Sequence, residues 1–323
     1  MTRISLVLCA YNPNPVRLKA TLAGISAQTG DGLEWETLLI DNASSPSIKL
    51  DAETVERAHV RMLRETTPGS GAARLRGFRE TAGRMVVIVD DDNVLAPGYL
   101  QSAAQFLRDH PQVGAVGGIN EPVFEAPPPA WIHGRLEAIA CREPWPETQI
   151  SRWWDESNPV REYPYFAPYG AGMCLRADCV AEYIRQIDQK VLAPVAGRIG
   201  AFPVGLEDCE LLVEAVLKAG WEIAFSPGLT LKHLIPARRC QISYLARMQA
   251  VAARQWAQFR IGHGWETPVT VIGGWLRILR TTLRNPPLRA ESYLRWRQAV
   301  GYQRGRMGKK GAEERRPETV QRP

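Results

Sequence analysis

The chain has 323 residues, 45% of them hydrophobic and 23% charged, which is typical of a soluble globular protein that buries a full core. Its net charge of +6 is unevenly distributed, because residues 244–310 hold 13 Lys or Arg against 2 Glu and residues 1–243 carry −5. A uniformly basic nucleic-acid-binding protein would not divide in this way, so we expect no nucleic-acid partner. No apolar stretch of the sequence approaches the roughly 20 residues of a membrane-spanning helix.

The first expected element is a strand in ISLVLCAY, residues 4–11. The basic start and the apolar run also fit a short signal peptide, but the run is minimal and no small-x-small cleavage site follows it. The chain has six cysteines: Cys9, Cys141, Cys174, Cys179, Cys209 and Cys240. Because they form no CxxC pair and lie mostly in apolar runs, we interpret them as reduced core thiols of a cytoplasmic protein.

Apolar runs then alternate with helical patterns through the first half of the chain. A helical pattern in residues 15–28 is followed by an apolar run in WETLLIDNAS, residues 35–44. A Gly-rich turn in residues 67–83 precedes the run RMVVIVDDDN, residues 84–93. Continuously apolar strands that alternate with helices predict an α/β fold with a mostly parallel sheet covered on both faces.

Polar side chains follow the expected strands: Tyr11 and Asn12 the first, Asp41 and Asn42 the second, and the triplet 90–92 of three aspartates the third. Ligands of such sheets bind beyond the carboxyl ends of the strands. Turn formation explains isolated Asn and Asp residues, but three adjacent carboxylates repel one another unless a cation or an ionised partner compensates. Mg²⁺ or Mn²⁺ at such a site bridges to phosphates, so the triplet predicts a phosphorylated ligand.

Three features of the second half each allow a structural and a functional interpretation. Asp208 begins an expected helix in residues 205–221 that ends at Gly220, and it is either an N-cap or a catalytic carboxylate. The glycines of GAGMCLRAD, residues 170–178, indicate close approach of another backbone as well as space for a substrate. His233 is either a packed side chain or a metal ligand, since neutral imidazole binds Mn²⁺.

A Pro- and Trp-rich insertion in residues 121–166 supplies aromatic side chains for either a substrate platform, which would hold an acceptor sugar if the resemblance described next holds, or a satellite core: Trp131, Trp145, Trp153, Trp154 and Tyr163. Residues 242–262 predict a helix packed on the preceding domain. Residues 269–284 predict an amphipathic helix with Arg277, Arg280 and Arg284 beside its apolar face. This helix either docks on the domain or lies on an anionic membrane surface.

Residues 3–235 resemble the family 2 glycosyltransferases of the GT-A fold, in particular bacterial enzymes that build surface polysaccharides from nucleotide sugars. The resemblance rests on the order of LVLCAYN, LLIDNASS, GSGAARLRG, VVIVDDDNVLAPGYL, GAGMCLRAD, GLEDCELL and LKH. It implies a Rossmann-like, mostly parallel central sheet flanked by helices and followed by a C-terminal helical extension. The implied catalytic domain is 1–240, with a nucleotide-binding half at about 1–120 and an acceptor and catalytic-base half at 121–240. A basic helical extension at 241–307 and a disordered tail at 308–323 would follow.

The resemblance also implies roles for individual residues. The metal ligands, for Mn²⁺ or Mg²⁺, would be Asp92, Asp90 and His233. The nucleotide would contact Ala10, Tyr11, Asn12, Asp41, Gly71, Arg74, Asp90 and Asp91. The donor sugar and the acceptor would lie at Gly170, Ala171, Gly172 and Met173. Asp208 would be the general base, with Glu207 shaping the site. The sequence departs from the family pattern at Leu75, where many relatives have Asn. The resemblance therefore gives less support to base or ribose contacts from the loop that contains Gly71 and Arg74.

The resemblance implies a metal-dependent inverting transfer from a nucleoside-diphosphate sugar, with UDP as the favoured nucleotide, to a saccharide or lipid-linked saccharide acceptor. The expected location is the cytoplasm, with peripheral contact of residues 269–310 to the inner face of the plasma membrane as one interpretation. A sugar-nucleotide pyrophosphorylase would need a Gly-rich phosphate loop with Lys or Arg after the first strand, which CAYNPNP lacks. A catalytically silent nucleotide-sugar scaffold would have lost the aspartate triplet or the Glu207–Asp208 pair, and both are present.

Overall fold

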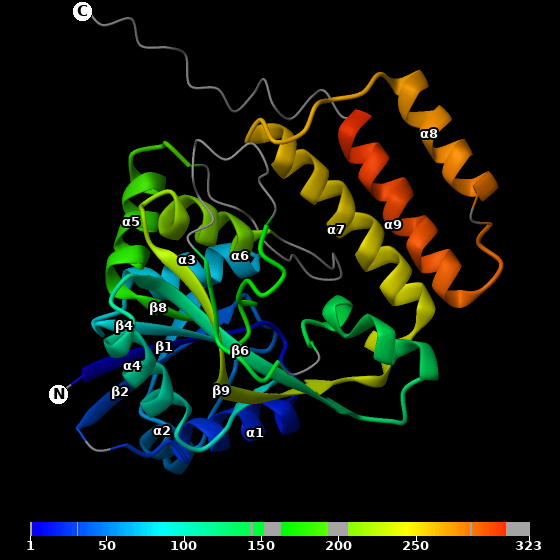
Figure 1. The fold of residues 1–323 in the computed structure, drawn as a ribbon. Coiled ribbons are helices and arrows are strands. Elements are labelled where there is room, and N and C mark those ends of the chain that lie inside the picture. The colour runs from blue at the N-terminus through cyan, green and yellow to red at the C-terminus, as the bar shows by residue number, and fades with distance from the viewer. Residues whose placement is uncertain are drawn as a thin grey trace, which may run out of the picture.

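The computed structural model describes residues 2–30, 32–142, 145–151, 163–192, 206–284 and 286–307. In this part of the chain, a nine-stranded sheet has the order β3-β2-β1-β4-β8-β6-β9-β5, and β7 pairs with β9 (Figure 1). The strands are β1 Thr2–Ala10, β2 Leu33–Asn42, β3 Val60–Glu65, β4 Met85–Asp90, β5 Asn93–Leu95, β6 Val113–Phe124, β7 Gln149–Ser151, β8 Cys174–Arg176 and β9 Glu222–Ile235.

The first four strands form the parallel half of the sheet and end at one rim. β1 pairs with β2 so that Ala10 lies opposite Asp41, and with β4 so that Cys9 lies opposite Asp90. β2 pairs with β3, which places Arg64 beside Asp41. This register brings the polar residues at or just beyond the ends of β1, β2 and β4 to one edge of the sheet, as the sequence predicts.

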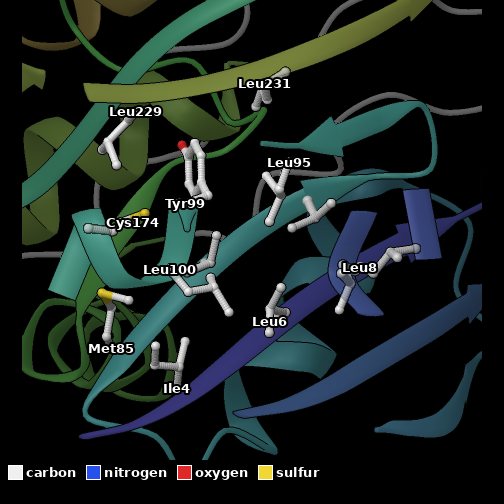
Figure 2. Close-up of a cluster of buried hydrophobic side chains, with 14 of the residues drawn as sticks. Ile4, Leu6, Leu8, Met85, Leu95, Tyr99, Leu100, Cys174, Leu229 and Leu231 are labelled. Atoms are coloured by element: carbon white, nitrogen blue, oxygen red, sulfur yellow. The ribbon is translucent and has the colours of Figure 1, made fainter. Parts of the chain in front are cut away.

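Helices cover both faces of the sheet, because alternate residues of each strand point to opposite sides. On one face, Leu6 and Leu8 of β1 belong to a core that includes Leu22 of α1 and Leu100 of α4 (Figure 2). On the other face, Val7 belongs to a core shared with α3, α5 and η2. The predicted α/β class is therefore confirmed. These helices are α1 Pro15–Ser26, α2 Ala52–Arg57, α3 Ser70–Arg79, α4 Tyr99–Asp109, α5 Ala177–Asp188, α6 Glu207–Glu210 and the π-helical η2 Leu211–Leu217.

The second half of the sheet brings distant residues back to the rim. β8 lies antiparallel between β4 and β6, and the long β9 runs parallel to β6. The short β5 pairs antiparallel with β9, with Asn93 opposite His233. The backbone N–H of Leu234 also donates to the Asp92 carbonyl at 2.8 Å. The aspartate triplet and His233 are thus held together by strand pairing, although they are far apart in the sequence.

Three helices after β9 form a separate layer beside the sheet (Figure 1). They are α7 Ile242–Gly262, α8 Val271–Arg284 and α9 Ala290–Met307. The 3₁₀ segment η3 Ala237–Cys240 lies between β9 and α7, and the 3₁₀ segment η1 Ala130–Ile139 follows β6. α9 packs closely on α7, since a Cβ at Gly301 would lie 2.1 Å from the Ala250 carbonyl oxygen. α8 packs on α9 through Gly274, against which Met307 lies. The predicted C-terminal helical extension is present, whereas the predicted tail 308–323 lies outside the described residues.

The apolar stripe of α8 faces outward. Ile272 is 76% exposed, Leu279 54% and Leu283 74%, while Gly274 and Ile278 on the inner side are buried. The helix therefore docks on α9 by one side and leaves the large apolar residues of its stripe half or more exposed among the described residues.

Candidate active site

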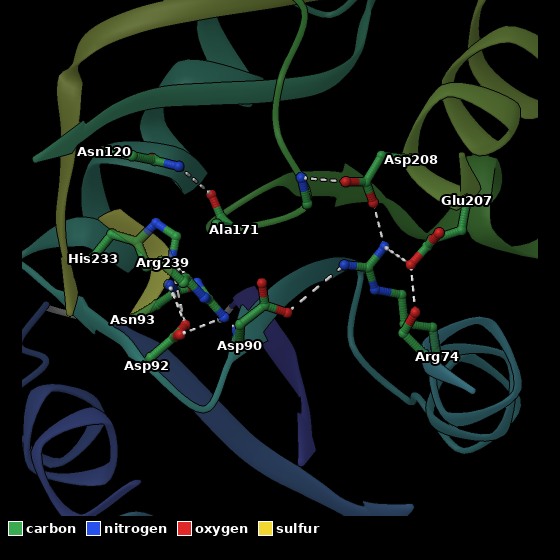
Figure 3. Close-up of polar contacts among 12 residues, drawn as sticks. Arg74, Asp90, Asp92, Asn93, Asn120, Ala171, Glu207, Asp208, His233 and Arg239 are labelled. Carbon is green, nitrogen blue, oxygen red and sulfur yellow. Dashed lines mark hydrogen bonds and ion pairs between the residues drawn. The ribbon is translucent and has the colours of Figure 1, made fainter. Parts of the chain in front are cut away.

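The first and the last aspartate of the triplet each face a different arginine (Figure 3). Asp90, the last residue of β4, faces Arg74 of α3, with 3.7 Å between its Oδ1 and the arginine Nη2. Asp92, in the turn to β5, faces Arg239 of η3, with 3.1 Å between its Oδ2 and the arginine Nη2. The two outer carboxylates of the triplet are therefore each compensated by an arginine.

Arg74 connects the end of β4 to the helix that carries the predicted base. Its side chain is 9% exposed, and its Nη1 forms an ion pair with Asp208 and lies 3.8 Å from Glu207 Oε1. Asp208, Glu207 and Asp90 all raise the pKa of Arg74, against the effect of its burial. Glu207 is held in turn by a hydrogen bond from the Ser70 hydroxyl. A single guanidinium thus gathers carboxylates from β4 and α6.

Asp208 does not cap its helix. The N-cap position of α6 is Leu206, and no side chain makes a capping hydrogen bond there. Asp208 instead accepts the Gly170 backbone N–H at Oδ2, 2.8 Å away. A Cβ at Gly170 would lie 2.5 Å from both Asp208 Oδ1 and Arg74 Nη2, so this position needs glycine for the close approach. The interpretation of Asp208 as a simple N-cap is wrong.

The environment of Asp208 suits a proton acceptor. Burial raises the pKa of Asp208, Arg74 opposes this effect, and repulsion from Glu207 and Asp90 adds to it. A raised carboxyl pKa makes the ionised form a stronger base near neutral pH. The side chain keeps 32% of its surface exposed, so a substrate hydroxyl can reach it.

Asp92 and His233 form a pair of candidate metal ligands. Their side chains are 6% and 3% exposed, and Asp92 Oδ1 lies 3.4 Å from His233 Nε2. Two ligands about 2.1 Å from one ion and at right angles would lie about 3 Å apart, so this separation fits shared coordination. The described residues hold no group of three or more His, Cys, Asp or Glu side chains placed to bind a metal ion. A carboxylate and an imidazole, completed by waters and phosphate oxygens, still fit Mn²⁺ or Mg²⁺.

The predicted nucleoside contacts lie in a network of loops after β1 and β2. The Asn12 backbone N–H donates to Ser44 Oγ at 2.9 Å, and the Ser45 backbone N–H donates to Asn12 Oδ1 at 2.9 Å. Asp41 Oδ1 accepts the Ser44 backbone N–H at 3.0 Å. Asp41 Oδ2 accepts the Ile48 backbone N–H at 3.1 Å and also pairs with Arg64. Asp41 therefore shapes this loop through its own carboxylate.

Of the other residues predicted to contact the nucleotide, some are exposed at the rim and others are buried. Tyr11 is 50% exposed at the rim, whereas Ala10 is buried. Burial, with repulsion from Asp92 and Asp90, raises the pKa of Asp91 to about 7. Gly71 lies in the first turn of α3, three residues before Arg74.

The segment 170–173 runs along the rim into the core. The Ala171 carbonyl accepts a hydrogen bond from Asn120 at 3.3 Å, and the Gly172 carbonyl accepts one from Tyr99 at 2.6 Å. Met173 is fully buried in the hydrophobic core, which gives its side chain a packing role.

A family model described as glycosyltransferase like family 2 matches residues 2–255. The chain belongs to this family. The match confirms the resemblance seen in the sequence. The chain is 29% identical over 103 residues to the uncharacterized glycosyltransferase YwdF of Bacillus subtilis (strain 168), a match that spans 32% of this chain and 37% of YwdF.

A solved structure at 19% identity shares the fold of this family 2 chain. Mannosyltransferase PcManGT from Pyrobaculum calidifontis, in complex with GDP-Man and Mn²⁺, superposes with a TM-score of 0.51 at 19% identity, over 93% of this chain and 73% of that one. S. aureus TarS 1-349 in complex with UDP gives a TM-score of 0.49 at 14% identity, over 94% of this chain and 90% of TarS. The first likeness supports the GT-A architecture.

Sequence reasoning missed three residues that complete the site of this glycosyltransferase-family chain. Arg239 faces Asp92, Ser70 supports Glu207, and Arg64 pairs with Asp41. The signal for Arg239 in the sequence is its place shortly after His233 in HLIPARR. Ser70 and Arg64 carry no signal of their own, because their partners come from other elements.

The Asp41 network predicts a pH-dependent loss of stability in Asp41→Asn. Burial raises the pKa of Asp41, but hydrogen bonds from Ser44, Ile48 and Arg64 outweigh it and hold the pKa below its ordinary value. A lowered pKa stabilises the folded state above the unfolded-state pKa near 3.8, and this advantage disappears as pH falls through the folded-state value.

We expect Asp41→Asn to lower the free energy of unfolding by about 1.5 to 3 kcal/mol at pH 7. Urea denaturation at pH 7 and at successively lower pH should show the difference from wild type shrinking below about pH 4. A difference that stays constant or grows on acidification would contradict a stabilising ionised Asp41.

Proposed function

We propose that this chain is a metal-dependent, inverting glycosyltransferase that uses a nucleoside-diphosphate sugar, with UDP-sugars as the first candidates. The observation that carries the proposal is the Arg74 guanidinium, which contacts both Asp208 and Asp90. A carboxylate with a raised pKa is thereby fixed beside the aspartates expected to face the donor diphosphate. Family membership makes glycosyl transfer the chemistry that this arrangement serves best.

Inversion at the anomeric carbon requires a base on one side and charge neutralisation on the other. Asp208 would take the proton of the acceptor hydroxyl as it attacks, and Gly170 and Arg74 hold the carboxylate in place. Asp92 and His233 would hold a divalent ion, which when bound neutralises the charge that develops on the leaving diphosphate. The two tasks are thus assigned to different elements at the same rim.

A cavity of about 630 Å³ offers a place for a saccharide acceptor. It lies between η1, α7 and α9, and its walls include Arg142, Trp145, Gln249 and Gln298. Aromatic, amide and guanidinium groups suit the faces and hydroxyls of sugars. Of the aromatic residues predicted as an acceptor platform, Trp145 lines this cavity, while Trp153 and Trp154 lie outside the described residues.

Arg142 links this cavity to the base. Its Nη2 donates to the Ala167 carbonyl at 2.9 Å, and its guanidinium carbon lies 4.1 Å from the centre of the Tyr169 ring. The side chain is buried, and its Nε and Nη1 find no hydrogen-bond acceptor among the described residues. Tyr169 directly precedes Gly170, so an acceptor held at Arg142 would lie along the same segment that positions Asp208.

The base assignment predicts a specific defect in Asp208→Asn. The amide keeps a hydrogen-bond acceptor for Gly170 but cannot take a proton, so turnover should fall by about 10² to 10⁴-fold. Release of nucleoside diphosphate from the sugar nucleotide that the wild type consumes would measure this loss. Donor affinity should change little, because Asp41, Asp92 and His233 are untouched.

Asp178→Asn is the matched control, since Asp178 is an exposed aspartate in the first turn of α5. It should turn over like the wild type. Near wild-type turnover by Asp208→Asn would show that Asp208 is not the base, and Glu207→Gln would then be the next variant to measure.

We also propose that α8 places the chain on an anionic membrane surface, where a lipid-linked acceptor would be found. The exposed stripe of Ile272, Leu279 and Leu283 is flanked by the exposed side chains of Arg277, Arg280 and Arg284. Apolar residues that enter the interface and arginines that meet anionic headgroups are the two components of such attachment. In the described residues, no helix is long and apolar enough to span a bilayer.

The triple variant Ile272→Ser, Leu279→Ser, Leu283→Ser tests this attachment without removing α9, which packs on α7. Because burial of each large apolar side chain contributes about 1.5 to 3 kcal/mol, cosedimentation with phosphatidylglycerol-rich vesicles should weaken at least tenfold. Val16→Ser with Val191→Ser changes exposed apolar residues elsewhere and should leave binding unchanged. Equal cosedimentation of the triple variant and the wild type would refute membrane docking by α8.

A further inference from the structure

Arg239 belongs to the site but has no role in the reaction described above. It lies on η3, after β9, and its side chain is only 16% exposed. Nη2 lies 3.1 Å from Asp92 Oδ2, and Nη1 lies 3.1 Å from His233 Nε2. Asp92 is the first of several acidic neighbours that raise the pKa of Arg239 against the effect of burial. The guanidinium is therefore a fixed positive charge on the two candidate metal ligands.

The contact between Arg239 and His233 determines which ring nitrogen of His233 carries the proton. A guanidinium has no acceptor, so His233 Nε2 must accept from Arg239 and the ring proton lies on Nδ1. Nδ1 is 3.6 Å from the Cys141 thiol sulfur, which is a weak acceptor for that proton. Asp92 and His233 consequently direct lone pairs toward one shared cation, the arrangement that a metal ion bound by both residues would require.

A divalent ion and the Arg239 guanidinium would need the same Nε2 lone pair. The imidazole nitrogen has one lone pair, so coordination of the ion breaks the hydrogen bond from Arg239. A buried guanidinium that loses its partners is unfavourable unless another anion replaces them. On the proposed function, the diphosphate of the donor is the anion that arrives at this rim, and Arg binds phosphate oxygens through two N–H groups at once.

We propose that Arg239 competes with the divalent ion for Asp92 and His233 and transfers its hydrogen bonds to the donor diphosphate when both bind. Binding of the metal and of the nucleotide are then coupled through one side chain. The ion alone displaces Arg239 at a cost, whereas the ion with a nucleoside diphosphate offers Arg239 a new partner. This inference rests on the proposed function for the diphosphate, while the competition with the metal stands on the geometry of Asp92, His233 and Arg239.

Mn²⁺ binding to the full chain, followed by the electron paramagnetic resonance signal of free Mn²⁺, tests the proposal without turnover. In the wild type, saturating UDP should tighten Mn²⁺ binding by roughly 5- to 150-fold, the usual range of coupling between two sites. Arg239→Ala should bind Mn²⁺ at least fivefold more tightly than the wild type when UDP is absent. Its enhancement by UDP should be smaller than that of the wild type, and the part that remains reflects the direct contact of the ion with the diphosphate. Arg239→Gln, which removes the charge but keeps an amide donor, should shift both quantities in the same direction.

Arg238→Ala is the matched control, because Arg238 is the exposed neighbour on η3 and the substitution removes the same charge. It should behave like the wild type in both measurements. If Arg239→Ala and Arg239→Gln bind Mn²⁺ alone no more tightly than the wild type, the competition is refuted. If they keep the full enhancement by UDP, the transfer to diphosphate is refuted. Failure of the wild type to bind UDP, GDP or dTDP with Mn²⁺ would contradict the proposed function, and the comparison with Mn²⁺ alone would still decide the competition.

Discussion

The ion pairs of Arg74 are the interaction on which the rest of the site depends. A guanidinium that is 9% exposed would be strongly destabilising by itself, and it is tolerated because Asp208, Glu207 and Asp90 surround it. Those three carboxylates come from β4 and α6, so the ion pairs fix the helix against the rim of the sheet. The requirement for glycine at position 170 follows from the same contact, since a side chain there would displace Asp208 or Arg74.

A second arginine balances the other end of the triplet. Arg239 faces Asp92 in the way that Arg74 faces Asp90, so each outer carboxylate has its own cation and Asp91 lies between them. The raised pKa of Asp91 is the consequence of that middle position, where burial and two acidic neighbours act together. Protein side chains thus already compensate the charge at this rim before any metal ion binds. On the account proposed above, a metal ion at Asp92 and His233 would have to compete with Arg239.

The sequence predicts those parts of the fold and of the site that follow from local pattern. Alternating apolar strands and helices predict the parallel half, and its register then brings Ala10, Asp41 and Asp90 to one edge. The contact of Asp92 with His233 requires the antiparallel pairing of β5 with β9, which no periodicity reveals. The helical pattern after Asp208 is visible, but its π-helical turn at Leu211–Leu217 and the side-chain contact with Gly170 depend on packing. For α8, periodicity predicts an apolar stripe around Ile272 but not that this stripe faces outward.

The proposed binding of a nucleoside-diphosphate sugar and a divalent ion at the rim can be measured by thermal unfolding with a panel of UDP-, GDP- and dTDP-sugars. A ligand that binds only the folded state stabilises it by about 2.7 kcal/mol at 100 times its Kd. We predict that at least one sugar nucleotide raises the Tm in the presence of Mn²⁺ or Mg²⁺ and has no effect in EDTA. An equal rise of the Tm with EDTA present would contradict the metal-dependent account.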